Sequence, residues 1–220
     1  MSHRPVILSE RLWFPDPRQA LRHPNGLLAI GGELSVPRLV LAYRSGIFPW
    51  TVHPATWWSP DPRAIIELDQ IHISRSLART LRQAPFKVTR DRAFRQVIES
   101  CAETHREGRW ITSEFVEAYT QLYEAGHAHS VECWQKGELV GGIYGVAIGG
   151  FFAGESMFFR VSNASKVALV NLVEHLRARG FTLFDVQMTT PTTQQFGAKL
   201  VPRDEYLQRL AAAVALAATF

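Results

Sequence analysis

One carboxylate in the chain stands in an unusually apolar setting. Residues 149–166 read GGFFAGESMFFRVSNASK and place Glu155 between four phenylalanines and a methionine. A glutamate is seldom fully buried without a partner, so a solvated position on the surface is one interpretation. The other is a partly desolvated carboxylate at the mouth of an apolar pocket, where it would receive a cationic or amine-bearing substrate.

A basic segment in the middle of the chain is the second candidate for a functional site. Between residues 74 and 96 the only acid is Asp91, and the cations are Arg75, Arg79, Arg82, Lys87, Arg90, Arg92 and Arg95. A solvated helix face would explain them. Tryptophans 50, 57, 58 and 110 suggest single-stranded nucleic acid as an alternative, because cations hold its phosphates and aromatic rings stack on its bases. Each tryptophan alone is more typical of core packing.

Other residues with catalytic potential form weaker patterns. His127 and His129 have the spacing of a metal-ligand pair, although two histidines entering a strand are more often structural. Cys101 and Cys133 form no C-x-x-C pair and no zinc motif, so we expect two reduced thiols rather than a disulfide. The sequence contains no G-x-S-x-G, H-E-x-x-H or Walker motif.

Composition indicates an ordinary globular protein. The chain has 220 residues, of which 46% are hydrophobic and 20% charged, enough for one large domain or for one medium and one small domain. Its net charge of +4 permits a polyanionic partner without proving one. The sequence shows no signal peptide and no apolar run that could span a bilayer, so we expect a cytoplasmic protein without membrane contact.

The elements that must position these residues fall into two parts. Prolines are concentrated in the first 62 residues, where the clearest element is a helix over residues 35–46. Ser35 can cap this helix, Pro37 lies in its first turn, and Gly46 supplies its left-handed stop. We therefore place a boundary near Pro62, with a small domain over residues 1–62 and a larger domain over residues 63–220.

The second part combines helices with an antiparallel meander. Helical spacing of apolar residues predicts a helix over residues 112–126, with Thr112 or Ser113 as its cap. Strands over residues 129–135, 138–148 and 151–159 follow, joined by glycine turns, and Glu155 lies on the third. A helix capped by Ser162 or Asn163 then runs to residue 180, before a buried strand over residues 181–188 and a final helix after residue 202.

This order of three antiparallel strands, a helix and another strand is that of GNAT-type acyltransferases. We predict an α+β fold: a GNAT-like domain with a mixed, largely antiparallel sheet flanked by helices, and a small N-terminal domain. GNAT enzymes bind a pyrophosphate through an R/Q-x-x-G-x-G/A loop, where this chain reads RVSNAS. Asn163 and Ser165 replace the glycines that allow backbone N–H groups to approach a phosphate, so a CoA-dependent acyltransferase is a weakened alternative.

A series of longer motifs resembles the leucyl/phenylalanyl-tRNA protein transferases. The motifs occur in the family's order and cover the chain from about residue 24 to residue 201. They are PNGLLAIGGELS, LVLAYRSGIFPW, WWSPDPRAII, HISRSL, WIT, AYTQLYEAGHAHSVE, LVGGIYGVA, FFAGESMFFR, NASKVAL and FDVQ. Several of them are long and individually improbable, which makes the resemblance very specific.

The resemblance implies an enzyme that moves an amino acid from tRNA to protein. It implies transfer of leucine or phenylalanine, and less readily methionine, onto an N-terminal arginine or lysine, which marks the acceptor for ATP-dependent proteolysis by the N-end rule. It also implies a GNAT-like catalytic domain, no metal and no CoA or other cofactor. The small N-terminal domain would help to hold the 3' end of the tRNA.

The resemblance also assigns roles to individual residues. Glu155, Asp185 and Gln187 would be catalytic, with Gln187 orienting the amine, Asp185 polarising Gln187, and Glu155 binding substrate or taking up a proton. Tyr43, Trp50 and Trp110 would hold the terminal adenosine. The leucyl or phenylalanyl side chain would be bound by Ile143, Phe152, Met157, Leu169, Leu172, Leu176, Phe184 and Val186. The tRNA backbone would contact Arg75, Arg79, Arg82, Lys87 and Arg90.

One segment departs from the family pattern. Where the family shows a His-Leu-x-Ser-Leu-Gly-Ala run after FDVQ, this chain reads TTPTTQQFGA and keeps only Gly197 and Ala198. Acceptor preference or rate could therefore differ. A tRNA-binding protein without activity is a further alternative, although the joint presence of Glu155, Asp185 and Gln187 argues against it.

Overall fold

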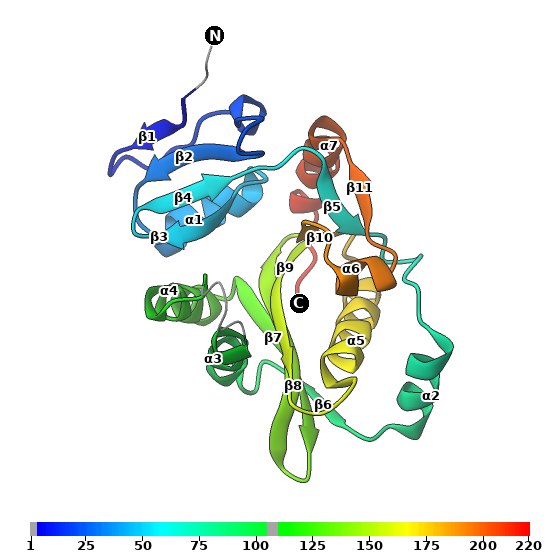
Figure 1. Cartoon of the computed structure of the whole chain (residues 1–220). Coiled ribbons are helices and arrows are strands. Elements are labelled where there is room, and N and C mark those ends of the chain that lie inside the picture. Colours follow the sequence, from blue (N-terminus) through cyan, green and yellow to red (C-terminus); the bar gives the residue numbers. More distant parts are fainter. Residues whose placement is uncertain (1–3, 105–109) are drawn as a thin grey trace.

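Two β-sheets organise the computed structural model, which describes residues 4–104 and 110–220 (Figure 1). The smaller has the strand order β1–β2–β4–β3 and the larger the order β11–β5–β10–β9–β8–β7–β6. The smaller sheet comprises β1 (Val6–Leu8), β2 (Leu27–Gly31), β3 (Phe48–Val52) and β4 (Ala55–Trp58). The larger comprises β5 (Arg63–Ile66), β6 (Lys87–Arg90), β7 (Ala128–Gln135), β8 (Glu138–Ile148), β9 (Phe151–Phe159), β10 (Leu183–Gln187) and β11 (Lys199–Val201).

Helices cover both faces of the larger sheet. Helices α3 and α4 lie on one face, and α5 lies on the other with α2 beside it (Figure 1). Their bounds are α2 (Arg75–Gln83), α3 (Phe94–Thr104), α4 (Ser113–Glu124) and α5 (Ala164–Ala178). The remaining helices are α1 (Val36–Arg44), α6 (Pro191–Gln195) and α7 (Arg203–Val214), with a short 3-10 helix η1 (Pro17–Gln19). No helix within the described ranges is long and apolar enough to cross a membrane.

The predicted fold class is confirmed. The meander β7–β8–β9, helix α5 and strand β10 occur in the expected order, and β10 pairs in parallel with β9 while its other neighbour, β5, is antiparallel. The result is a mixed, largely antiparallel sheet flanked by helices, preceded by a small N-terminal sheet. One cluster of buried residues runs from Trp57 of the smaller sheet to Phe158 of the larger, and the domain boundary at residue 62 stays a prediction.

The predicted residues Ser35, Thr112 and Asn163 stand at the N-caps of α1, α4 and α5, but only Thr112 caps its helix with its side chain. The Thr112 hydroxyl accepts from the Phe115 N–H at the start of α4, as expected for a threonine N-cap. Asn163 precedes α5 in the left-handed conformation, with φ of 67°, and makes no capping hydrogen bond with its side chain. Its amide instead donates to the Thr80 hydroxyl at 3.3 Å, which joins α5 to α2.

The register of the larger sheet shifts at three places, and two of these β-bulges lie beside candidate site residues. Tyr144 pairs with Ser156 and Gly145 pairs with Gly154, so Glu155 is an extra residue on β9. On β10 the extra residue is Val186, because its neighbours 185 and 187 pair with consecutive residues of β5. A bulge bends its strand and re-aims the local side chains, and here both bulges adjoin residues that the sequence had singled out.

The first bulge requires a glycine on the facing strand. A Cβ atom at Gly145 would lie 2.1 Å from the Ala153 carbonyl oxygen and 2.5 Å from the Phe152 ring. We expect Gly145→Ala to lower the free energy of unfolding by about 3 kcal/mol, because backbone atoms cannot move aside cheaply. The measurement is urea unfolding followed by circular dichroism.

Gly137→Ala is the matched control for this prediction. Gly137 also lies in the meander, at φ of 84°, but its Cβ would meet nothing within 4 Å. Only the backbone strain remains, about 1 kcal/mol. Equal losses in the two variants would contradict the steric argument.

Candidate active site

A cavity of about 470 Å³ is lined by nine of the fourteen residues that the sequence analysis assigns to catalysis, the adenosine or the side-chain pocket. The N-terminal sheet contributes Phe48, Pro49 and Trp50, and the centre of the chain contributes Thr104 and Trp110. The rest of the wall consists of Ile143, Gly154, Glu155, Ser156, Met157, Phe159, Ser165, Lys166, Leu169, Phe184, Val186, Gln187, Met188, Thr190, Thr192 and Thr193. The cavity is therefore bordered by strands of both sheets and by helix α5.

The apolar part of this cavity matches the expected side-chain pocket in part. All eight predicted residues belong to one apolar cluster, and five of them line the cavity: Ile143, Met157, Leu169, Phe184 and Val186. Phe152, Leu172 and Leu176 do not. They are at most 1% exposed and pack behind the wall, because helix and strand periodicity places them on the buried face but one layer deeper.

Glu155 lies in the cavity wall with two hydrogen-bond donors. Its carboxylate accepts from Gln187 Nε2 at 3.0 Å and from Tyr119 Oη at 3.4 Å. The Tyr119 hydroxyl is also hydrogen-bonded to that of Tyr43, which is buried. Tyr43, expected near the adenosine, thus lies behind Glu155 rather than in the cavity wall. The structure unites Glu155 and Gln187 as a contacting pair.

The surroundings of Glu155 change its acidity. Burial, with a smaller contribution from the charge of Asp185, raises the pKa of Glu155 to about 7. The hydroxyls of Tyr43 and Tyr119 and the charge of Arg63 act in the opposite direction without cancelling the effect of burial. The carboxyl group can therefore exchange a proton near neutral pH.

Asp185, which is expected to polarise Gln187, contacts the backbone of that residue. Its side chain is fully buried and forms an ion pair with Arg63, at 2.9 Å and 2.7 Å for the two arms of the guanidinium. It also accepts from the Tyr206 hydroxyl at 2.8 Å and from the backbone N–H of Gln187 at 2.9 Å. The carboxylate therefore contacts the backbone of Gln187 and not its side-chain amide.

Aromatic rings form another part of the wall. Trp50 packs against Trp58 with ring centroids 5.1 Å apart, and Trp110 meets Phe115 edge to face at 5.7 Å. Trp50 and Trp110 both line the cavity and are partly exposed. Rings held in this way offer flat apolar surfaces to a ligand.

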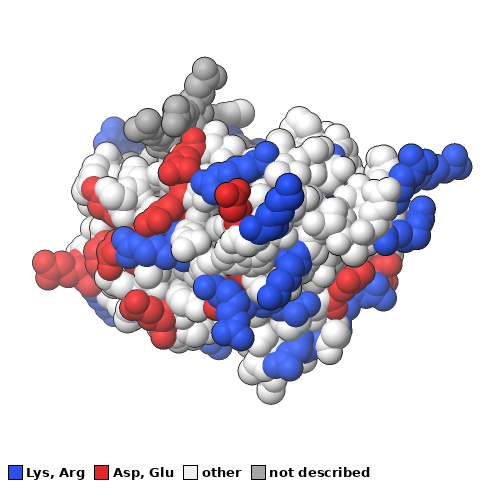
Figure 2. Space-filling view, turned by 90° about the horizontal axis from the view of Figure 1, so that it is seen from below, with Lys and Arg blue, Asp and Glu red and all other residues white. Residues whose placement is uncertain are grey.

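The basic residues lie on a different part of the surface. Arg75, Arg79 and Arg82 project from α2, and Lys87 and Arg90 from the edge strand β6. All five are exposed, and none takes part in an ion pair with another described residue. Both elements lie low in Figure 1, and the view from below in Figure 2 shows basic side chains gathered across this face.

The segment that departs from the family pattern borders the same cavity. Residues 191–195 of this segment form helix α6, and the N-cap residue Thr190 makes a reciprocal capping box with Thr193. Thr190, Thr192 and Thr193 line the cavity, and Lys166 beside them donates to the Gln195 side chain at 3.1 Å. The changed residues are therefore in a position to contact a ligand.

The histidine and cysteine patterns have structural surroundings. His129 Nδ1 lies 2.8 Å from Asp91, and its ring stacks on Phe220 with centroids 4.3 Å apart. Cys101 and Cys133 are buried free thiols, and burial raises the pKa of each to about 12. Residues with such contacts are held as parts of the core.

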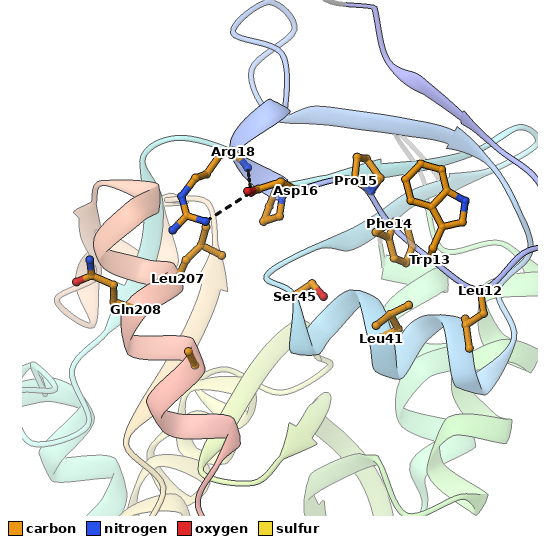
Figure 3. Close-up of a pocket in the computed structure, with 12 residues that line it drawn as sticks. Leu12, Trp13, Phe14, Pro15, Asp16, Arg18, Leu41, Ser45, Leu207 and Gln208 are labelled. Atoms are coloured by element: carbon orange, nitrogen blue, oxygen red, sulfur yellow. Dashed lines mark hydrogen bonds and ion pairs between the residues drawn. The ribbon is translucent and has the colours of Figure 1, made fainter.

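A second hollow, of about 760 Å³, lies away from this cavity (Figure 3). Residues 12–18, Leu41 of α1 and Leu207 of α7 contribute to its lining. Its two charged side chains, Asp16 and Arg18, lie 3.5 Å apart, and Arg18 also pairs with Asp204 at 2.6 Å. Both charged side chains of this lining are therefore engaged in ion pairs.

The α+β, GNAT-like fold and a cavity with an ionisable carboxylate beside an amide define a protein of the acyltransferase class. Comparison with known sequences gives the particular family. The model of the leucyl/phenylalanyl-tRNA protein transferases matches residues 65–211, and the model of the N-terminal domain of these enzymes matches residues 32–61. The chain belongs to the leucyl/phenylalanyl-tRNA protein transferase family.

Individual relatives agree with this family. The leucyl/phenylalanyl-tRNA–protein transferase of Pectobacterium carotovorum subsp. carotovorum is 51% identical over 206 residues, which are 93% of this chain and 88% of the relative. That of Shigella dysenteriae serotype 1 is 53% identical over 199 residues, or 90% and 85% of the two chains. A solved structure of L-PGS from Bacillus licheniformis reaches only 17% identity and a TM-score of 0.43, over 69% of this chain and 51% of its own.

The raised pKa of Glu155 predicts how stability depends on pH. Between its usual pKa of 4.5 and the folded value of about 7, the folded protein keeps a proton that the unfolded chain releases. The contribution of Glu155 to the free energy of unfolding is therefore fully present below pH 4.5 and is lost as the pH rises to 7. Glu155→Gln should raise the free energy of unfolding by about 3 kcal/mol at pH 8 and by less than about 1 kcal/mol at pH 5.

Urea unfolding at the two pH values measures this difference. Glu138→Gln is the control, because Glu138 is exposed on the meander and should respond at neither pH. A Glu155→Gln variant with the same stability as the unaltered protein at pH 8 would show that the carboxylate is not desolvated.

Proposed function

We propose that this protein transfers leucine or phenylalanine, and less readily methionine, from aminoacyl-tRNA to the N-terminal arginine or lysine of acceptor proteins. The product would be tagged for proteolysis in the cytoplasm. The observation that carries the proposal is a single cavity, in a chain of this family, that combines apolar walls, two tryptophans and the Glu155–Gln187 pair. In this proposal residues 1–62 help to hold the tRNA 3' end and residues 63–220 form the catalytic domain.

The aminoacyl group would occupy the apolar end of the cavity. A volume of about 470 Å³ suits an amino-acid side chain together with part of a nucleoside. Ile143, Met157 and Leu169 would contact the leucyl or phenylalanyl group, while Phe152 and Leu172 support them from behind. Such a pocket selects by shape and discriminates only modestly for each methylene, which accords with acceptance of several apolar amino acids.

The terminal adenosine would lie between the aromatic walls. Trp50 and Trp110 provide the stacking surfaces, and their packing on Trp58 and Phe115 supports them. Tyr43 then acts indirectly, through the hydroxyl pair with Tyr119 that borders Glu155. We therefore assign Tyr43 a positioning role.

The chemical step is aminolysis of an ester. The neutral α-amine of the acceptor attacks the carbonyl carbon, the bond between that carbon and the ribose oxygen breaks, and a peptide bond forms. Glu155, with a pKa of about 7, is suited to accept the proton that the amine loses and to pass it to the departing ribose oxygen. Gln187 donates to Glu155 through Nε2, which leaves its amide oxygen to orient the amine. Asp185 acts through the backbone of Gln187 as a positioning residue.

Two other functions fit parts of the structure less well. A CoA-dependent acyltransferase is favoured by the element order, but the loop before α5 has Asn163 and Ser165 in place of glycines, and Asn163 contacts Thr80 instead of the helix N-terminus. An inactive tRNA-binding protein is favoured by the exposed cations of α2 and β6. Acetyl-CoA should raise the melting temperature only in the first case.

Transfer of radiolabelled leucine tests the proposed function. We expect incorporation from Leu-tRNA into a protein that begins with arginine, and none into the same protein beginning with alanine or after ribonuclease treatment. Glu155→Gln should lower turnover about 100-fold, as should Gln187→Ala, because each removes a group that handles the amine. Affinity for tRNA should stay within a few-fold. Binding of tRNA without any transfer would favour the inactive binder.

The basic face has a separate prediction. Each lysine or arginine on a phosphate releases a counterion, so affinity for tRNA should fall as salt rises. Charge reversal in Arg79→Glu with Arg82→Glu should weaken binding of all tRNAs alike and reduce the slope of log affinity against log salt by about 2. Filter binding at several salt concentrations measures the slope.

Arg177→Glu is the control for the basic face, because Arg177 is equally exposed but lies near the far end of α5. The slope should not change in this variant. An unchanged slope in the double variant would remove α2 from the RNA-binding surface.

A further inference from the structure

We propose that Arg63 is a positioning residue of the transfer reaction, which it controls through Asp185 and the backbone of Gln187. The inference rests on the proposed function, because it concerns the direction in which the side-chain amide of Gln187 points toward Glu155. Arg63 begins strand β5 and is only 1% exposed, so it cannot contact a substrate in the cavity. Its effect must pass through the groups that surround it.

Each side-chain nitrogen of Arg63 and each carboxylate oxygen of Asp185 has a hydrogen-bond partner. Two charges removed from water are stable together only when their geometry is good and their remaining polar atoms are paired. The Arg63 fork reaches both oxygens of Asp185, and its third nitrogen donates to the Gly46 carbonyl at 3.1 Å. Tyr206 and the Gln187 N–H occupy the other acceptor sites of the carboxylate. The position of Asp185 is thereby fixed from three sides.

The fixed carboxylate holds an unusual backbone turn. Gln187 has φ of 56°, in the left-handed region that side-chain-bearing residues rarely adopt, and it follows directly on the bulge at Val186. The hydrogen bond from its N–H to Asp185 Oδ1 spans this turn. The turn sets the direction of the Gln187 side chain, whose amide meets Glu155 at 3.0 Å. Movement of Asp185 would therefore misdirect the amide.

Arg63 also connects this turn to the aromatic wall of the cavity. Its guanidinium lies between the Phe48 ring, at 4.8 Å, and the Tyr206 ring, at 4.6 Å. Phe48 lines the cavity and lies 6.3 Å from Trp50. One buried cation thus contacts the N-terminal sheet, the strand that carries Gln187 and helix α7. This contact holds the adenosine wall and the amine-orienting group in one arrangement.

Two conservative variants test the inference. Arg63→Lys keeps the charge but loses the fork, and Tyr206→Phe keeps the ring but loses one hydrogen bond to Asp185. We expect kcat for leucine transfer to fall on the order of tenfold to 100-fold in Arg63→Lys and about fivefold in Tyr206→Phe. KM for Leu-tRNA should change much less than kcat. Hydrogen exchange of the backbone N–H of Gln187 should be faster in both variants.

The matched control is Arg38→Lys. Arg38 is also fully buried, and it binds Glu33 and the backbone carbonyls of residues 9–11 away from the cavity. We expect this variant to lose stability while kcat and exchange at Gln187 stay unchanged. A purely structural role for Arg63 would give the same pattern in both lysine variants.

The pH profile provides a further readout. Among the described residues, the ionisable groups that influence Glu155 are Tyr43 of α1, Tyr119 of α4, Tyr144 of β8, Asp185 of β10, Arg63 of β5 and Tyr206 of α7. Arg63→Lys retains the positive charge among them, so the pH at which activity falls should stay in place while the maximum rate drops. A shift of that pH with an unchanged maximum rate would show that the substitution alters the electrostatics of Glu155 and not the direction of the Gln187 side chain, and it would overturn the inference.

The outcomes separate the inference from the proposed function. Transfer by the unaltered protein with unchanged kcat in Arg63→Lys would overturn the inference alone. If Arg63→Lys fails to fold, Tyr206→Phe decides, and an unchanged kcat and Gln187 exchange in that variant would overturn it. No transfer by the unaltered protein from Leu-tRNA would overturn the proposed function and this inference with it.

Discussion

The site depends on removing Glu155 from most of its contact with water without giving it a cation of its own. A buried carboxylate paired with arginine becomes a weak base, because the ion pair lowers its pKa. Glu155 is bordered instead by the hydroxyl of Tyr119 and the amide of Gln187, and the nearby Arg63 has both arms engaged by Asp185. The pKa of Glu155 is thus about 7, so the carboxyl group can exchange a proton in neutral solution.

Two register breaks build this environment. In a regular strand, successive side chains alternate between the two faces of a sheet. The extra residue on β9 allows residues 154–157 in succession to border the cavity, and the extra residue on β10 brings Val186 and Gln187 to the same space. The close approach of Gly145 to Ala153 is the steric condition for the first bulge. Sheet geometry, rather than a mobile loop, therefore positions the polar pair.

The sequence predicted the longer elements because their local signals agree. Alternation and glycine turns located β7, β8 and β9, and the Thr112 cap located α4. The four-stranded N-terminal sheet was not predicted, since its strands have only three to five residues and β3 contains Pro49, which local rules place outside a central strand. The turn at Gln187 was also missed. Its left-handed residue is a glutamine, and sequence rules recognise such a turn by a glycine.

The site was predictable only where a residue's type limits its surroundings. Glu155 stood out because a carboxylate among phenylalanines requires an explanation. The pairing of Arg63 with Asp185 joins residues 122 positions apart in the sequence and leaves no periodic signal. Depth is equally hidden, since the spacing of Leu169, Leu172 and Leu176 is alike although only Leu169 reaches the cavity.

The loop before α5 connects the fold to the kind of acyl donor. GNAT enzymes place a pyrophosphate against backbone N–H groups at this point, which requires glycines. Here the Asn163 side chain binds Thr80 and so attaches α2, with its exposed arginines, beside the N-terminus of α5, whose residues Ser165 and Lys166 border the cavity. The polyanion of the donor would then be held by a basic surface outside the cavity instead of inside a loop. A donor whose anionic part is as large as tRNA needs such a surface, because its phosphates extend far beyond the reach of one turn.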